Sequence, residues 1–281
     1  MKTAVILPAA GSGTRFADPS RVAKGKNKIE IDLAGRPVFM CAIEMFSQRN
    51  DVAQIILAVH PEHLETFKFR WGDKVAFHDV QLIAGGTVGR WETVQRALEV
   101  VSDECSHVAV HDAARPMTPQ LLIDRVFTAA ENHSAVIPGL RVSHTLKRVE
   151  NAPSQNDHTD QDRRLDAILG STEADLSIWS VIETIPRADL FEVQTPQIFE
   201  RALLQRAYAA LDPQAGSNIT DDAQLIELIG EPVHLVEGST LNIKLTYATD
   251  ADLAAAYLQA SHQKQAAELG RRRLFTDDDE D

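Results

Sequence analysis

The first residues with chemical potential form a loop of small side chains after an apolar segment. The segment Thr3–Leu7 leads into Ala9-Ala10-Gly11-Ser12-Gly13-Thr14-Arg15-Phe16. Small residues let backbone N–H groups approach phosphate oxygens, because no bulky side chain holds the anion away. The loop lacks the lysine of a Walker P-loop and the third glycine of the dinucleotide fingerprint. Arg15 and Lys28 could place two cations around a polyphosphate, whereas a tight turn without function is the alternative.

A second candidate site follows the short apolar run Val108–Val110. It reads His111-Asp112-Ala113-Ala114-Arg115-Pro116. A carboxylate at the C-terminal end of a central strand faces the ligand crevice of an α/β sheet, and the Mg²⁺ that accompanies a nucleotide prefers carboxylate and phosphate oxygens. Asp112 is therefore the predicted metal ligand, and His111 is interpreted as structural. Alternatively, Asp112 caps the next turn and Arg115 forms a surface ion pair.

The elements that must position these residues alternate strand and helix, which is typical of βα units that feed a mostly parallel sheet. The predicted sheet is doubly wound and binds its ligands at the C-terminal ends of its strands. The sequence predicts strands at Thr3–Leu7, Gln54–Val59, within Val75–Ile83, at Val108–Val110 and from Ala135, and helices at Pro37–Ser47, Glu62–Phe69, Trp91–Val101 and Pro119–Asn132.

Residues 142–187 interrupt this alternation. The stretches Thr145–Val149 and Ser177–Thr184 are rich in β-formers and are expected to pair as a hairpin, with a short helix at Arg164–Leu169 and a polar, disordered loop at Asn151–Asp162 between them. The remaining predicted elements are helices at Glu200–Leu211, Asp221–Ile229 and Asp250–Leu269, and strands at Val233–Val236 and Asn242–Thr246. We expect one domain over residues 1–260, with the arm and insertion at 142–187, and a helix end with a disordered acidic tail at 261–281.

Composition limits the classes of partner. The chain has 281 residues, 44% of them hydrophobic, and a formal net charge of −13. This charge argues against general binding to nucleic acid or to anionic membranes. The tail 277–281 and the stretch 150–175 together carry −10 of the −13, so the rest is nearly balanced. Two cysteines without a CxxC pair, an N-terminal apolar run too short for a signal sequence, and the lack of about 20 consecutive apolar residues favour a cytoplasmic protein.

Seven segments, in order, resemble one enzyme family. They are AAGSGTRF, NKIEIDLAGRPV, VHDAARP, HTLKR, QTPQIF, ITDDAQL and VEGSTLNIKLT. Together they are similar to the 2-C-methyl-D-erythritol 4-phosphate cytidylyltransferases over about residues 3–258. The resemblance implies an α/β, Rossmann-like, mostly parallel sheet of the nucleotide-diphospho-sugar transferase type with a protruding β-arm. It also implies transfer of a cytidylyl group from CTP to methylerythritol phosphate with release of pyrophosphate, Mg²⁺ as cofactor, and a homodimer that exchanges β-arms.

The resemblance also assigns roles to residues. It implies that Arg15, Lys28 and Lys244 are the catalytic cations near the phosphates and that Asp112 binds the metal. The implied nucleotide-binding residues are Ala9, Ala10, Gly11, Gly86, Thr93 and Asp112, and the implied substrate-binding residues are Arg115, Thr195 and, from the partner's arm, Thr145 and Arg187. Lys244 lies in an apolar context where an unpaired charge is costly, which favours a functional role. Arg90, before the helix at Trp91, is interpreted as either functional or solvated.

The chemistry implied by the resemblance needs positioning and charge neutralisation rather than covalent catalysis. The substrate phosphate, already ionised, attacks the α-phosphorus of CTP in line without a general base. Two departures affect the arm. His144 stands where the family has an acid, and about 20 additional residues lie between Arg148 and Thr184. The alternatives are a cytidylyltransferase for another polyol phosphate, such as ribitol 5-phosphate, and a non-catalytic nucleotide-binding regulatory protein.

Overall fold

A computed structural model describes residues 1–11, 28–150, 179–212, 216 and 219–260. Within these residues the chain forms two compact units. The first comprises residues 1–140 and the part of the chain from Val193 onward, and the second comprises residues 141–192. The predicted short helix Arg164–Leu169, the loop Asn151–Asp162, Arg15 and the tail lie outside the described residues.

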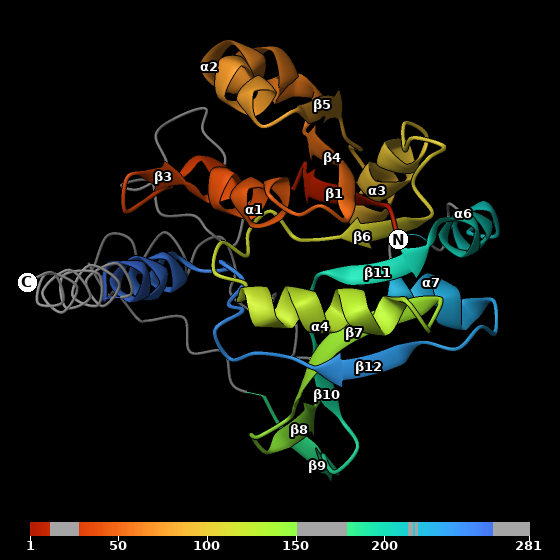
Figure 1. The fold of residues 1–281 in the computed structure, drawn as a ribbon. Coiled ribbons are helices and arrows are strands. Elements are labelled where there is room, and N and C mark those ends of the chain that lie inside the picture. Colours follow the sequence, from red (N-terminus) through yellow and green to blue (C-terminus); the bar gives the residue numbers. More distant parts are fainter. Residues whose placement is uncertain (12–27, 151–178, 213–215, 217–218, 261–281) are drawn as a thin grey trace, which may run out of the picture. The chain divides into compact units, whose positions relative to one another are not determined.

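A mostly parallel sheet is the centre of the first unit (Figure 1). Its strand order is β7-β11-β6-β1-β4-β5, and β12 pairs with β7. The pairs β1–β4, β1–β6, β4–β5 and β7–β12 are parallel, whereas β11 runs antiparallel to both β6 and β7. The strands are β1 (Thr3–Ala9), β4 (Val52–Val59), β5 (Val80–Ala84), β6 (His107–Val110), β7 (Ala135–Arg141), β11 (Gln197–Glu200) and β12 (His234–Glu237).

The strand order places a topological switch point between β1 and β6. From β1 the chain adds β4 and then β5 on one side, and it returns to add β6 on the other side of β1. Loops that leave the carboxyl ends of two such strands turn away from each other and open a crevice. The small-residue loop after β1 and the His111-Asp112 sequence after β6 are the two loops at this point.

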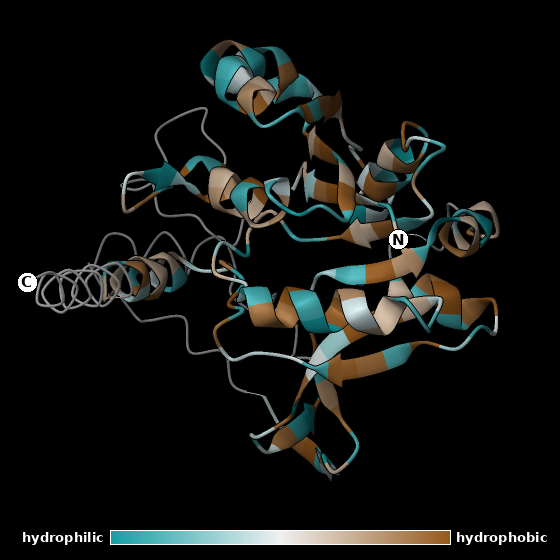
Figure 2. Ribbon diagram, in the orientation of Figure 1, coloured by the Kyte–Doolittle hydropathy of each residue, from teal (hydrophilic) through white to brown (hydrophobic). Residues whose placement is uncertain are grey.

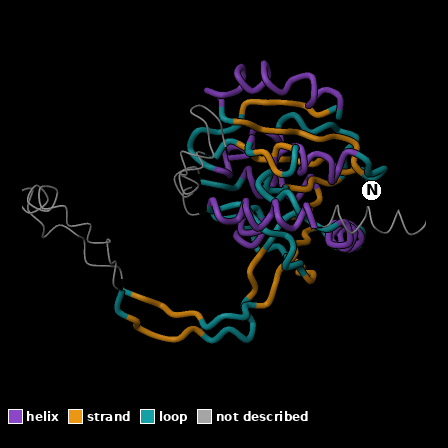
Figure 3. The backbone as a smooth tube through the Cα atoms, turned by 90° about the vertical axis from the view of Figure 1, so that its left-hand side faces the viewer, coloured by secondary structure: helices purple, strands orange, loops and turns teal. Residues whose placement is uncertain are grey.

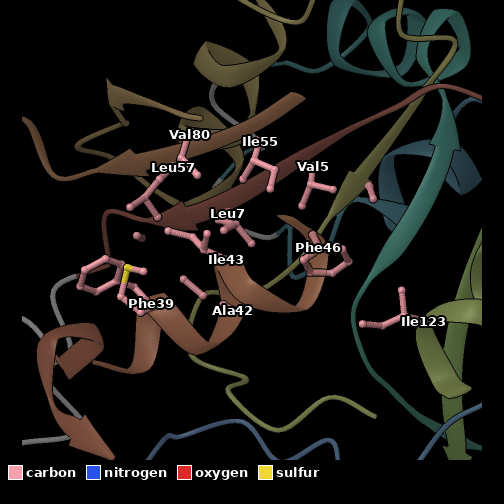
Figure 4. Packing of buried hydrophobic residues seen from close by; sticks show 14 of the residues in the cluster. Val5, Leu7, Phe39, Ala42, Ile43, Phe46, Ile55, Leu57, Val80 and Ile123 are labelled. Carbon is pink, nitrogen blue, oxygen red and sulfur yellow. The ribbon is translucent and has the colours of Figure 1, made fainter. Parts of the chain in front are cut away.

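Helices cover both faces of the sheet because alternate strand residues are apolar on opposite sides. Val5 and Leu7 pack with α1, α2 and α4, as Figure 4 shows for the α1 side chains, whereas Ile6 and Ile56 pack with α3, α6 and α7. In Figure 2, α4 shows the alternation of hydrophilic and hydrophobic residues expected of a helix with one buried side. The helices are α1 (Val38–Ser47), α2 (Leu64–Phe77), α3 (Arg90–Leu98), α4 (Gln120–Ala130), α6 (Arg201–Ala209) and α7 (Ala223–Leu228).

Two predicted elements differ in the structure, and the antiparallel strand β11 between β6 and β7 was not predicted. The helix predicted at Glu62–Phe69 continues as α2 to Phe77, so the strand expected within Val75–Ile83 begins only at Val80. No strand forms at Asn242–Thr246. This segment bonds to a loop instead, since Leu245 N–H donates to the carbonyl of Ala114 at 2.8 Å. The short turns and ribbons η2 (Lys28–Glu30), η3 (Pro61–His63), β2 (Asp32–Leu33) and β3 (Arg36–Pro37), with a helix over 248–260, complete this unit.

The second unit contains the predicted hairpin. Strands β8 (Leu146–Val149) and β9 (Val181–Ile185) pair antiparallel, with Lys147 opposite Thr184. They are among the orange segments of Figure 3. The expectation that the two flanks of the insertion pair with each other is thus confirmed. The chain leaves this unit through β10 (Phe191–Val193).

Candidate functional site

The carboxyl ends of β1, β5 and β6 bring together the loops that the sequence singled out. Ala9 is the last residue of β1, and Ala10 and Gly11 follow it. A Cβ placed on Gly85, directly after β5, would lie 2.9 Å from Ala10 Cβ and 2.8 Å from Thr93 Cγ2. This closeness explains why small residues occupy both loops. The loop after β1 and the Gly85-Gly86 turn therefore meet.

The Gly85-Gly86 turn is tied to the start of α3 by side chains of that helix. Gly86 N–H donates to Thr93 Oγ1 at 3.0 Å. The carboxylate of Glu92 accepts the N–H groups of Thr87 and Val88 at 2.7 and 2.8 Å. The bond from Val88 N–H is the main cause that lowers the pKa of Glu92. Thr93, predicted from the resemblance, therefore shapes the turn, and Glu92 is a structural residue that the sequence analysis missed.

Adding one methyl group at Gly85 should destabilise this loop pair. We expect Gly85→Ala to lower the free energy of unfolding by about 1–3 kcal/mol, since Ala10 and Thr93 must move to admit the new Cβ. The matched control is Gly72→Ala within α2, where a Cβ meets nothing within 4 Å and where alanine favours the helix. Urea unfolding of both variants measures the difference. Equal stability of the two variants would contradict the close packing of these loops.

Asp112 is the centre of the site's charges. Its carboxylate lies 2.8 Å from Lys244 Nζ, 3.3 Å from Arg90 Nε and 3.5 Å from Arg115 Nε. Asp112 is only 8% exposed. Burial alone would raise the pKa of this carboxyl, but Lys244, Arg90 and Arg115 outweigh burial and hold the pKa well below its usual range. The site therefore keeps a permanent carboxylate among three cations.

Arg90 connects Asp112 to a second buried carboxylate. Its Nη1 donates to Asp222 Oδ2 at 2.6 Å, and the hydroxyl of Tyr208 donates to Asp222 Oδ1 at 2.6 Å. Burial alone would lower the pKa of Arg90, but Asp222 and Asp112 raise it. Of the two interpretations, a solvated Arg90 is wrong. Asp222 and Tyr208 are site residues that the sequence analysis missed, although Asp222 lies in the quoted segment ITDDAQL.

The histidine before Asp112 belongs to a buried hydrogen-bond chain. Thr195 Oγ1 accepts the N–H of Asp112 at 3.0 Å and lies 3.2 Å from His111 Nδ1, while His111 Nε2 lies 3.4 Å from the carbonyl of Arg115. A carbonyl oxygen can only accept a hydrogen bond, so Nε2, which faces the Arg115 carbonyl, carries the ring proton. Nδ1 therefore accepts the hydroxyl proton of Thr195. This arrangement requires a neutral imidazole. Burial lowers the pKa of His111 to about 4, which agrees with the structural role predicted for it.

His111 should make the fold sensitive to mild acid. Between pH 6.5 and about 4 the unfolded chain binds a proton on this ring and the folded protein does not. Its stabilising contribution is therefore complete above pH 6.5 and declines as the pH falls to about 4, by about 3 kcal/mol in total. We expect His111→Asn to remove this part of the pH dependence of unfolding, whereas His63→Asn, at an exposed position, retains it. Parallel pH profiles for wild type and His111→Asn would contradict the assignment.

Lys28 and Arg115 approach the segment that carries Lys244. Lys28 Nζ donates to the carbonyl of Leu245 at 3.4 Å, and Arg115 Nη1 donates to the carbonyl of Asn242 at 2.7 Å. The Asn242 side chain in turn donates to the carbonyl of Thr195 at 2.8 Å. Residues from four distant parts of the sequence thus converge beside β6, as the resemblance implies. Asn242 is the organising residue that the sequence analysis did not select.

The turn that carries Lys28 has a buried anchor of its own. The carboxylate of Glu30, two residues later in η2, lies 2.7 Å from Arg70 Nη1 and 3.5 Å from Trp71 Nε1, both on α2. Its side chain is only 2% exposed. No local pattern in the sequence indicates this contact, because Glu30 and α2 are about 40 positions apart.

Thr145 and Arg187 both lie in the second unit. Arg187 donates to the carbonyl of Ser143, and Lys147 Nζ donates to Thr184 Oγ1 at 2.6 Å across the hairpin. His144, which replaces the family's acid, is exposed. The substrate-binding roles of Thr145 and Arg187 stay predictions.

The described residues contain neither a multi-ligand metal cluster nor a membrane-spanning helix. Within them, no group of three or more His, Cys, Asp or Glu side chains is arranged to hold a metal ion. None of their helices has the length and apolar character needed to cross a bilayer.

Comparison with known proteins identifies the family. The family model for 2-C-methyl-D-erythritol 4-phosphate cytidylyltransferase (IspD) matches residues 3–169 and 165–260. The enzyme of that name from Rhodopirellula baltica is 35% identical over 265 residues, which cover 90% of this chain and 93% of the relative. The one from Frankia casuarinae is 36% identical over 258 residues, covering 92% and 81%.

Solved structures agree with the sequence relatives. The crystal structure of 2-C-methyl-D-erythritol 4-phosphate cytidylyltransferase from Thermus thermophilus has a TM-score of 0.63 and 28% identity, and the match covers 92% of this chain and all of that one. A crystal structure of 4-diphosphocytidyl-2C-methyl-D-erythritol synthase has a TM-score of 0.66 and 26% identity, covering 92% and 99%. The predicted α/β fold is confirmed. The chain belongs to the 2-C-methyl-D-erythritol 4-phosphate cytidylyltransferase family.

Proposed function

We propose that this chain transfers the cytidylyl group of CTP to 2-C-methyl-D-erythritol 4-phosphate and releases pyrophosphate. The observation that carries this proposal is the cluster of Arg90, Arg115 and Lys244 around Asp112 at the switch point of the sheet, with Lys28 bonded to the backbone of the segment that carries Lys244. Such a group of cations suits a reaction between two phosphates, because it offsets their mutual repulsion and the charge of the transition state. The family relationship supplies the identity of the two substrates.

Arg115 has hydrogen-bonding capacity left for a phosphate. Its Nε is buried and finds no hydrogen-bond partner among the described residues, since 3.5 Å to Asp112 is an ion-pair distance and too long for a good hydrogen bond. A buried donor without a partner is costly unless a ligand satisfies it. This supports the proposed role of Arg115 in binding the phosphate of the second substrate. The hydroxyl of Thr195 already donates to His111, so it could only accept a hydrogen bond from the substrate.

We propose Mg²⁺ as the cofactor, with Asp112 as its protein ligand. A single ionised carboxylate is a suitable donor for Mg²⁺, which in nucleotide sites usually takes one or two carboxylates and completes its shell with phosphate oxygens and water. When bound, Mg²⁺ would neutralise phosphate charge. Lys28, Lys244 and Arg115 would orient the two phosphates, and Asp112 would fix the position of the metal.

A pyrophosphate-release assay with CTP tests the function. We expect turnover with 2-C-methyl-D-erythritol 4-phosphate and little or none with ribitol 5-phosphate. Preference for ribitol 5-phosphate would favour the other polyol phosphate cytidylyltransferase, and turnover with neither substrate would favour a regulatory protein. No specific feature of the structure supports ribitol 5-phosphate as the substrate, and the cluster of cations around Asp112 argues against a regulatory protein.

We further propose that the chain is a homodimer that associates through its arm and that Thr145 and Arg187 reach the site of a second copy. The described residues of the arm include five exposed apolar side chains, namely Leu146, Val149, Trp179, Val181 and Ile182, with Val181 59% and Ile182 55% exposed. Neighbouring strand residues point to opposite faces, so both faces of β9 present apolar surface. Exposed apolar surface of this kind marks an interaction site.

The dimer proposal predicts the effect of a charge on the arm. We expect Ile182→Asp to convert a dimer into a monomer, because association would bury the new carboxylate. Sedimentation velocity measures the change. Leu121→Asp on α4, at a position that is 77% exposed, is the control and should leave the sedimentation coefficient unchanged. A monomeric wild type, or a dimeric Ile182→Asp variant, would contradict the proposal.

A cytoplasmic location is also proposed. The free thiols of Cys41 and Cys105 suit a reducing compartment.

A further inference from the structure

Lys244 differs from the other two cations around Asp112 in how it is held. Arg90 is also bonded to a second buried carboxylate, and Arg115 is also bonded to a backbone carbonyl. Within the described residues, Asp112 is the one group that the Lys244 ammonium contacts. The Lys244 side chain is 40% exposed, against 25% for Arg90 and 9% for Arg115. Lys244 is therefore the cation that can leave Asp112 without breaking a second interaction.

The charges around Asp112 disfavour a metal ion that arrives alone. Asp112 and Asp222 are negative and Arg90, Arg115 and Lys244 are positive, so the group already has one excess positive charge. A free divalent cation would add to this excess and compete with the ammonium for Oδ2. Such repulsion is weakly screened in a partly buried site. A metal that arrives with a triphosphate brings more negative than positive charge, and it offers the ammonium a new partner.

We propose that Lys244 exchanges partners during the reaction. In the free enzyme its ammonium occupies the place of the metal at Asp112, and when the metal and nucleotide bind together it moves to a phosphate of the nucleotide. This inference rests on the proposed role of Asp112 as metal ligand. It makes the free enzyme a poor binder of divalent metal, and it makes metal binding depend on the nucleotide.

Equilibrium dialysis with Mn²⁺ as the probe tests the exchange without turnover, because the second substrate is left out. We expect wild-type protein to retain little Mn²⁺ alone and to retain Mn²⁺ together with CTP. We expect Lys244→Met, dialysed without CTP, to bind Mn²⁺ about tenfold tighter than wild type, since the competing charge is gone. The gain should disappear in the double variant Lys244→Met with Asp112→Asn.

The matched control is Lys68→Met on α2, whose ammonium pairs with Glu65 on the surface. It should bind Mn²⁺ as wild type does, and circular dichroism checks that each variant is folded. Equal Mn²⁺ affinity of wild type and Lys244→Met in the absence of CTP overturns the exchange while leaving the metal role of Asp112 intact. Failure of wild type to retain Mn²⁺ with CTP overturns the proposed metal role itself, and the exchange with it.

Discussion

Asp112→Asn should abolish turnover and destabilise the protein at the same time. The substitution keeps the size of the side chain but removes the negative charge that Lys244, Arg90 and Arg115 share. Three cations then remain close together, and removal of one partner from a buried ionic group costs about 3–5 kcal/mol. The proposed metal ligand is lost as well, so we expect kcat/KM to fall by about 10²-fold or more. Pyrophosphate release and urea unfolding measure the two effects.

Asp103→Asn is the control for this prediction. Its carboxylate also pairs with an arginine, Arg201, but the aspartate side chain is fully exposed. Exposed ion pairs contribute little to stability, so both activity and the free energy of unfolding should stay near the wild-type values. Loss of activity in Asp112→Asn without loss of stability would mean that the three cations relax into solvent. Normal activity would exclude Asp112 from the reaction.

Most of the architecture could be predicted from the sequence because most buried strands are short apolar runs and most surface helices show a 3.6-residue period. The failures occurred where neighbours decide the structure. At Asn242–Thr246 the residue types favour a strand, but the segment binds the loop at Ala114 instead of a sheet edge. At Val75–Phe77 the apolar pattern is compatible with a helix or a strand. In the structure these residues form the last turn of α2, and Val75 packs in the core.

The charged centre of the site could be predicted, but the residues that support it could not. Asp112 follows a buried strand, and Lys244 is a charge in an apolar context, so each carries a local signal. Asp222, Glu30 and Asn242 carry none, because their roles depend on partners such as Arg90, which is 132 positions from Asp222. A single sequence does not contain that pairing. The same limit explains why Arg90 remained between a functional and a solvated interpretation.

Lys28→Ala should depress turnover by orders of magnitude and leave the fold intact. Lys28 is a part-buried cation on the short turn η2, and its contact to the Leu245 carbonyl is long at 3.4 Å. Its proposed task is to neutralise charge that develops on the reacting phosphates, and removal of one such donor typically lowers kcat by about 10²–10³-fold. Initial rates with CTP, together with the unfolding midpoint, measure both expectations.

Two further variants separate the charge of Lys28 from its position. Lys28→Arg keeps the charge but changes its geometry, so intermediate activity would indicate that charge supplies most of the effect and placement the rest. Lys68→Ala removes an exposed lysine paired with Glu65 and should leave kcat unchanged. Near-normal activity of Lys28→Ala would exclude a catalytic role, and neutralisation of the phosphates would then depend on Arg115 and Lys244, which both contact Asp112.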